Sequence, residues 1–136
     1  MRGIYSMFEL LGRILIALMF LQSGMGKISS YTTTSQYMAS KGVLPGLLPV
    51  VIILEVAGSL ALILGWKTRL FAFLLAGFCL LAAGLFHLDF ADHTQTIMFM
   101  KDISIAGGFL IIFARGAGEL SLDSKLSRHT ADELRF

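Results

Sequence analysis

Four long apolar stretches divide the chain, at residues 7–28, 47–66, 70–88 and 97–114. Each is close to the roughly 20 residues that a helix needs to cross a bilayer. Proline, glycine or charged residues stand between the stretches, as expected where helices end. The stretches do not alternate with the period of two that marks membrane strands. The pattern therefore predicts an all-α, polytopic membrane protein built as a bundle of four transmembrane helices.

Composition narrows the class of protein further. Of the 136 residues, 56% are hydrophobic and 15% are charged, whereas a soluble domain carries about a quarter charged residues. The mean hydropathy is +0.78. These values exclude a soluble enzyme, a disordered chain and a nucleic-acid binder as first interpretations. The first stretch is predicted to be a retained span, because Arg13 interrupts it and no signal-peptidase motif follows it.

Basic residues predict the orientation of the bundle, because loops rich in Lys and Arg stay in the cytoplasm. Placing both termini in the cytoplasm puts seven basic residues on that side and three on the other. The seven are Arg2, Lys67, Arg69, Arg115, Lys125, Arg128 and Arg135, and the three are Lys27, Lys41 and Lys101. The sequence thus predicts one membrane domain over residues 1–120 and a polar cytoplasmic tail over residues 121–136.

The first outer loop, residues 29–44, also carries a pattern. Thr34 and Ser35 are suited to capping a short helix that runs through Gln36 to Met38 and stops at Gly42. Its aromatic residues suit the headgroup zone of the membrane. The loop is therefore predicted to form a short interfacial helix. Two roles stay open for this helix, a lid over a site or a segment that fills space on the outer surface.

Ionisable residues inside the spans are the strongest functional signal, because each is costly to insert and normally faces the bundle interior. Glu55 lies near the middle of the second span. Lys27, His87 and Lys101 lie toward the outer ends of the other three spans, and each is predicted on a face that carries small residues, which permit close helix packing. The pattern predicts an outer polar pocket. The same groups are also compatible with salt bridges that only hold the helices in register.

A second set of charges belongs to the inner part of the first span. Glu9 and Arg13 are four residues apart, a spacing that favours an ion pair on one helix face. No metal site is predicted, because the motif His87-x-Asp89-x-x-Asp92-His93 matches no closed metal pattern. Haem is not expected with a single histidine near a span. Cys79 is the only cysteine, so no intramolecular disulfide and no cysteine-pair redox chemistry are available.

Several short motifs together resemble one known family. They are G-R-I-L from residue 12, S-G-M-G-K from 23, Q-Y-M from 36, L-E-V-A-G from 54, G-W-K-T-R from 65, L-F-H from 85, M-F-M-K-D from 98 and I-A-G-G-F-L from 105. Their order and their place on four spans resemble the DoxX family of small bacterial inner-membrane proteins. The likeness is greatest to its YqjF-like subgroup, whose members are labelled quinol oxidase subunits.

The resemblance implies a four-helix bundle in the bacterial cytoplasmic membrane. It also implies kinship with the membrane subunit of thiosulfate:quinone oxidoreductases and with mycobacterial members that assemble with soluble redox enzymes. In one respect the chain departs from the family, because Asp102 stands where relatives carry Asn. The chain has no second cysteine or flavin motif, which leaves thiosulfate oxidation without an evident redox centre.

Residues and resemblance together give the first hypothesis, a redox-linked membrane subunit that binds a quinone in the outer half of the bundle. Glu55 is predicted as its catalytic proton acceptor or donor. His87, Lys101 and Lys27 are predicted to bind the quinone, and Glu9, Arg13 and Asp102 to form a structural polar network. The only cofactor predicted is a quinone, without haem, metal or flavin.

The alternative hypothesis is non-enzymatic. The chain would be a membrane scaffold that docks a soluble redox enzyme through its polar tail, or a carrier of a small solute. Both hypotheses include contact with the lipid bilayer. Both also include a homo-oligomer, because the short helices expose much small-residue surface.

Overall fold

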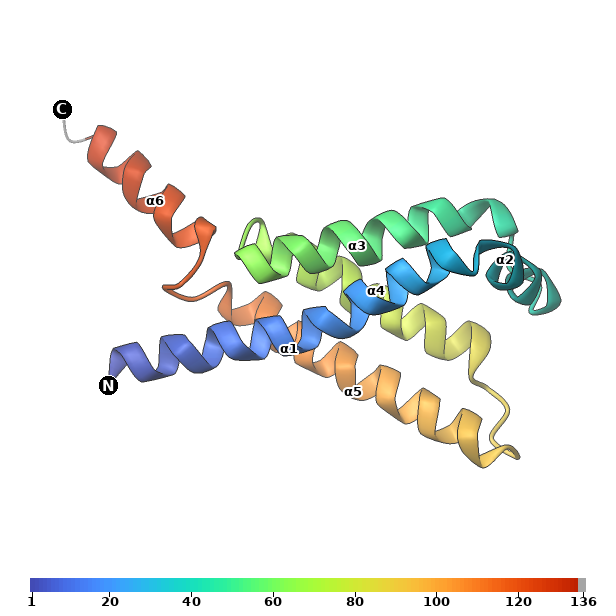
Figure 1. The fold of residues 1–136 in the computed structure, drawn as a ribbon. Coiled ribbons are helices and arrows are strands. Elements are labelled where there is room, and N and C mark those ends of the chain that lie inside the picture. Colours follow the sequence, from blue (N-terminus) through green and yellow to red (C-terminus); the bar gives the residue numbers. More distant parts are fainter. Residues whose placement is uncertain (135–136) are drawn as a thin grey trace.

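The computed structural model describes residues 1–134, and every regular element in that part of the chain is a helix (Figure 1). The elements are α1 (Arg2–Ser29), α2 (Tyr31–Ser40), the 3₁₀ helix η1 (Pro45–Leu47), α3 (Leu48–Leu64), α4 (Thr68–Phe86), α5 (His93–Arg115) and α6 (Leu122–Glu133). Four helices are long and apolar enough to cross a membrane: α1, η1 with α3, α4 and α5. The predicted four-span bundle with a short additional helix is confirmed.

Local chemistry explains where the helices begin and end. Asp92 starts α5 because its side chain accepts a hydrogen bond from the Thr94 N–H at 2.8 Å, which satisfies a free donor of the first turn. Consequently α5 begins four residues before the predicted apolar stretch. Gly65 ends α3 with φ +71, a left-handed conformation that glycine adopts without a steric penalty.

The predicted short helix exists but begins earlier than its pattern indicated. α2 starts at Tyr31, directly after α1, so Thr34 and Ser35 lie inside the helix and do not cap it. The end of the helix was placed correctly. Gly42 follows with φ +74 and donates its N–H to the Ala39 carbonyl at 3.0 Å.

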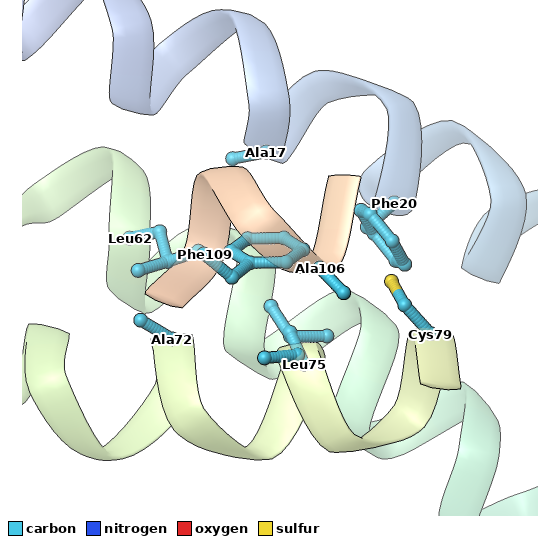
Figure 2. Packing of buried hydrophobic residues seen from close by; sticks show 9 residues of the cluster. Ala17, Phe20, Leu62, Ala72, Leu75, Cys79, Ala106 and Phe109 are labelled. Atoms are coloured by element: carbon cyan, nitrogen blue, oxygen red, sulfur yellow. The ribbon is translucent and has the colours of Figure 1, made fainter. Parts of the chain in front are cut away.

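The spans pack mainly as two neighbouring pairs, α1 against α3 and α4 against α5, with α3 joined to α4. Phe109 of α5 lies at the centre of the buried cluster between the pairs, where it meets side chains of the other spans (Figure 2). The cluster also contains Ala17, Phe20, Leu62, Ala72, Leu75, Ala76, Cys79 and Ala106. Its many small residues allow close approach of helices in a lipid environment, where water does not drive their association.

The two ends of the bundle differ. Both termini and the turn between α3 and α4 lie at one end, called here the terminal end, and α2 lies at the other, called the α2 end (Figure 1). Beyond α5, the chain predicted as a polar tail forms α6, which projects away from the bundle (Figure 1). Arg135, which entered the orientation count, and Phe136, the last residue of the predicted tail, lie outside the described residues.

Asp123 fixes the start of α6 to the bundle. Its carboxylate accepts hydrogen bonds from the backbone N–H groups of Lys67, at 2.8 Å, and Thr68, at 3.0 Å. The Asp123 N–H in turn donates to the Gly65 carbonyl at 2.8 Å. The first turn of α4 is therefore capped by a side chain from the far end of the sequence, and part of the predicted tail is structural.

Candidate functional site

A cavity of about 390 Å³ opens at the α2 end, between α1, α3 and α4 and beneath α2. We call it the α2-end cavity. Most of its wall is apolar, with Phe20, Leu48, Val51, Phe78 and Leu85 among the lining residues. The volume is typical of a small-molecule pocket, as is an apolar wall with a few polar groups. Those polar groups form two clusters, around Glu55 and around His87.

The first cluster is centred on Glu55, which is 1% exposed. Ser23 Oγ donates a hydrogen bond to Glu55 Oε1 at 3.0 Å. Lys27 Nζ donates to the same oxygen at 3.0 Å and to Ser23 Oγ at 2.7 Å, and it lies 2.9 Å from Glu55 Oε2. The ammonium thus neutralises a carboxylate that is closed off from solvent.

Gly24 makes this cluster possible. A Cβ atom at this position would lie 2.8 Å from Val56 Cγ2 and 3.1 Å from the Cβ of Glu55. α1 and α3 are therefore in close contact at the height of the carboxylate. The missing side chain lets Ser23 and Lys27, on either side of Gly24 in sequence, reach across to Glu55.

The second cluster joins the end of α4 to α5. His87 Nδ1 lies 2.7 Å from Gln95 Oε1, a hydrogen bond in which the amide oxygen is the acceptor. The other ring nitrogen, Nε2, lies 3.7 Å from Asp102 Oδ2. This separation is too long for a hydrogen bond, and the imidazole nitrogen and the carboxylate face each other unbonded.

Two buried carboxylate oxygens therefore keep a free acceptor. Glu55 Oε2 and Asp102 Oδ2 have no hydrogen-bond partner among the described residues, and both residues line the α2-end cavity. The Lys27 contact to Oε2 is an ion pair without hydrogen-bond geometry. Buried polar atoms in folded proteins are nearly always hydrogen-bonded, so the two oxygens are equipped to receive donors from a bound molecule.

α2 covers one side of the cavity. Thr34, Tyr37 and Met38 line it, and Met38 is buried. The Tyr37 ring stacks on Phe86 at the end of α4, with ring centroids 5.6 Å apart and planes inclined by 21°. The contact holds α2 against the end of α4. Entry of a molecule into the cavity from this side therefore depends on how firmly α2 is packed.

Of the four residues predicted for the outer pocket, Lys27, Glu55 and His87 line the α2-end cavity. The placement of Lys101 was wrong. Lys101 is exposed and lines a separate surface depression with Thr96 and Met100. Its neighbour Asp102 faces the cavity in its place, because adjacent residues on a helix point about 100° apart.

Sequence reasoning missed the inward direction of Asp102 and the contributions of Ser23, Gln95 and Cys79. A signal was present for Asp102. It precedes the buried Ala106 by four residues and the buried Phe109 by seven, the spacing of one helix face. For Gln95, which holds His87 from the following helix, the pattern offered no comparable signal.

The structure also differs from the ion pair that was predicted between Glu9 and Arg13. Within residues 1–134, no ion pair joins Glu9 to Arg13. Arg13 Nη2 donates to the Leu120 carbonyl at 2.5 Å, while Glu9 Oε1 lies 3.7 Å from Arg115 Nη2. The prediction used the geometry of α1 alone, whereas both side chains contact partners near the end of α5.

No group of three or more His, Cys, Asp or Glu residues in the described part of the chain is placed to hold a metal ion. The polar clusters of the α2-end cavity can bind and orient hydrogen-bonding molecules and hold or release protons. The Cys79 thiol also lines the cavity, outside both clusters.

Comparison with known proteins adds independent information. The sequence model of the DoxX family matches residues 8–88. The chain is 45% identical over 119 residues to inner membrane protein YqjF of Escherichia coli (strain K12), covering 88% of this chain and 92% of that protein. It is 35% identical over 124 residues to inner membrane protein YphA of the same organism, covering 85% and 88%. No solved structure matches the chain.

Proposed function

This chain belongs to the DoxX family and is a multi-pass inner-membrane protein with four membrane spans, and from that premise we propose that it binds a quinone in the α2-end cavity. The excess of basic residues at the terminal end supports an orientation with both termini in the cytoplasm. In that orientation the cavity belongs to the outer half of the bundle.

The observation that carries the proposal is the pair of free acceptors, Glu55 Oε2 and Asp102 Oδ2, in a cavity with apolar walls. A quinone ring is apolar on both faces and polar only at its two opposed oxygens. The cavity therefore suits a molecule whose apolar body fills the space and whose two polar ends reach the polar groups. When bound, a quinone supplies reversible two-electron, two-proton chemistry.

The residues of this chain would bind the two forms of such a ring differently. The free oxygens of Glu55 and Asp102 accept hydrogen bonds from the hydroxyl groups of the reduced form. The Lys27 ammonium can donate to a carbonyl of the oxidised form, since it has three protons. Glu55 is the group placed to take up or return a proton, because its carboxyl group lines the cavity and can exist in a charged or a protonated form.

His87 and Lys101 take different positions in the proposal. His87 binds through its Nε2 side, with Gln95 fixing the orientation of the ring. Lys101, which the sequence pattern assigned to quinone binding, has no part in the cavity, and Asp102 takes its place.

The test is to purify the full chain in a mild detergent, extract its small molecules and measure quinone by mass spectrometry. We expect about one quinone per chain in the wild type and a loss of roughly tenfold in Glu55→Gln, because a charged hydrogen-bond partner is removed. Lys101→Met is the matched control and retains the quinone. Absence of quinone from the wild type, or equal amounts in Glu55→Gln, overturns the proposal.

One observation favours a second candidate function, a scaffold for a soluble redox protein. α6 projects from the bundle and has no buried residue. Its first residues are structural, because Asp123 caps α4. A fair test therefore removes residues 125–136 and keeps the cap. Loss of a co-purifying soluble protein on this truncation supports the scaffold, and unchanged recovery rejects docking through α6. The predicted homo-oligomer stays a prediction for cross-linking in native membranes.

A further inference from the structure

A second hollow lies near the terminal end, between α1 and α5. It is a groove of about 310 Å³ whose lining includes Gly12 and Arg13 of α1 and Gly108, Arg115 and Gly116 at or next to α5. α1 and α5 touch each other much less than either touches its main partner. We call this hollow the α1–α5 groove. It is separate from the α2-end cavity and shares no lining residue with it.

Arg13 is the most unusual residue of this groove. It is 2% exposed, and only its Nη2 has an acceptor, the Leu120 carbonyl. Its Nε and Nη1 have no hydrogen-bond partner within residues 1–134. Its Nη1 lies against Gly65 at the end of α3. A buried guanidinium with unfilled donors is costly, and an anion is the acceptor best suited to complete its hydrogen bonding.

Charge around the groove also favours an anion. Arg115 lines it, and Arg69 Nε lies 3.3 Å from the position of a Cβ atom at Gly116. Arg13 and Arg115 thus line the groove, and Arg69 approaches it at Gly116. Glu9 opposes them, but its carboxylate is 3.7 Å from Arg115 Nη2, too far for a hydrogen bond. Arg115 therefore keeps its donors for another acceptor.

The rest of the groove is apolar. Phe8, Ile16, Ile111 and Ile112 line it, and a Cβ atom at Gly12 would meet no atom within 4 Å. Arg115 is the last residue of the α5 span, so the basic end of the groove lies at the level of the lipid headgroups and the apolar part lies beside the acyl chains. A free anion would use only the basic end.

We propose that the α1–α5 groove binds an anionic phospholipid, with the phosphate at Arg13 and Arg115 and one acyl chain along the apolar part. Basic pockets between spans are the usual form of such sites. The phosphate supplies the acceptor that Arg13 lacks, and bidentate contacts of guanidinium to phosphate are strong.

The test measures lipid binding to the full chain in detergent by native mass spectrometry. Phosphatidylglycerol is the probe, phosphatidylcholine is the neutral comparison, and inorganic phosphate is titrated separately. We expect phosphatidylglycerol to bind at least tenfold more tightly than phosphatidylcholine. Arg115→Gln should weaken it by roughly tenfold, because a charge-assisted contact is lost. Arg128→Gln, on exposed α6, is the matched control and should bind like the wild type.

A second variant separates a lipid site from a phosphate-ion site. Gly12→Leu fills the groove and leaves the arginines in place, and Gly26→Leu puts the same side chain into open space elsewhere on α1. Loss of phosphatidylglycerol in Gly12→Leu but not in Gly26→Leu supports the proposal. Equal binding of the two lipids, unchanged binding in both Gly12→Leu and Arg115→Gln, or inorganic phosphate binding as tightly as the lipid, overturns it.

Discussion

Lys27 Nζ donates a hydrogen bond to Glu55 Oε1 at 3.0 Å and lies 2.9 Å from Glu55 Oε2, where the contact is an ion pair without a hydrogen bond. The two side chains come from different spans and are unequally exposed, at 25% for Lys27 and 2% for Glu55. Because the carboxylate is the more deeply buried partner, the loss of Lys27 and the loss of Glu55 should not have equal effects.

The first prediction concerns this pair. Lys27→Met leaves the Glu55 charge buried without its counter-ion and should lower the free energy of unfolding by about 3 kcal/mol. Glu55→Gln should cost less, since the amide can still accept from Ser23. A double-mutant cycle, measured by denaturation in mixed micelles, should give a coupling of about 1 kcal/mol or more. Strictly additive effects would show that the pair contributes nothing to stability.

The second prediction concerns the contact between α1 and α3. Gly24→Ala forces a Cβ atom against Val56 and should destabilise the bundle by about 1–3 kcal/mol, with quinone retention reduced because Ser23 and Lys27 move away from Glu55. The matched control is Gly26→Ala on the same helix, where a Cβ atom meets nothing within 4 Å. That variant should be neutral or slightly stabilising, since alanine favours a helix over glycine. Similar losses in both variants would contradict the close approach at Gly24.

The third prediction concerns the link between the two halves of the sequence. Asp123→Ala removes the cap from α4 and should cost about 1 kcal/mol. The backbone amides of Lys67 and Thr68 should exchange their hydrogens faster. Asp132→Ala, an exposed position on the same helix as Asp123, should change neither quantity. Unaltered exchange at Lys67 and Thr68 in Asp123→Ala would rule out the capping bonds in solution.

The fourth prediction concerns α2. Tyr37→Ala removes the stacking on Phe86, a contact of about 0.5–1.5 kcal/mol, and should speed hydrogen exchange over residues 31–40 by several-fold. Tyr31→Ala is the comparison, because it truncates an exposed tyrosine of the same helix. If the Tyr37 variant also loses quinone faster on dilution, α2 acts as a lid. If exchange rises while quinone release is unchanged, α2 only fills space at the surface.

Element type and span number could be predicted from the sequence because they depend on local composition. Four apolar runs of membrane length leave few alternatives, and Gly42 marks a helix end by its conformational freedom. Rotation of a helix about its axis was harder to predict. In α5 both the Lys101 face and the Asp102 face carry small residues, so the choice between them depended on packing against α4.

Long-range polar contacts were the least predictable feature. The acceptor of Arg13 is the backbone carbonyl of a residue 107 positions away, and a carbonyl has no sequence signature. Asp123 likewise looks like an ordinary charged residue of a polar tail, although it caps α4. Both contacts depend on how the end of α5 returns to the α3–α4 turn, which is determined only when the four spans are packed.

The bond from Arg13 to Leu120 has a consequence for biosynthesis. A chain is made and inserted from its first residue onward, so the first span enters the membrane carrying a guanidinium whose acceptor has not yet been synthesised. The hydrogen bond of Arg13 therefore cannot form until Leu120 has been synthesised, after all four spans. A chain that stops before residue 120 would leave this buried guanidinium without its acceptor. A turn synthesised after all four spans thus completes the hydrogen bonding of α1.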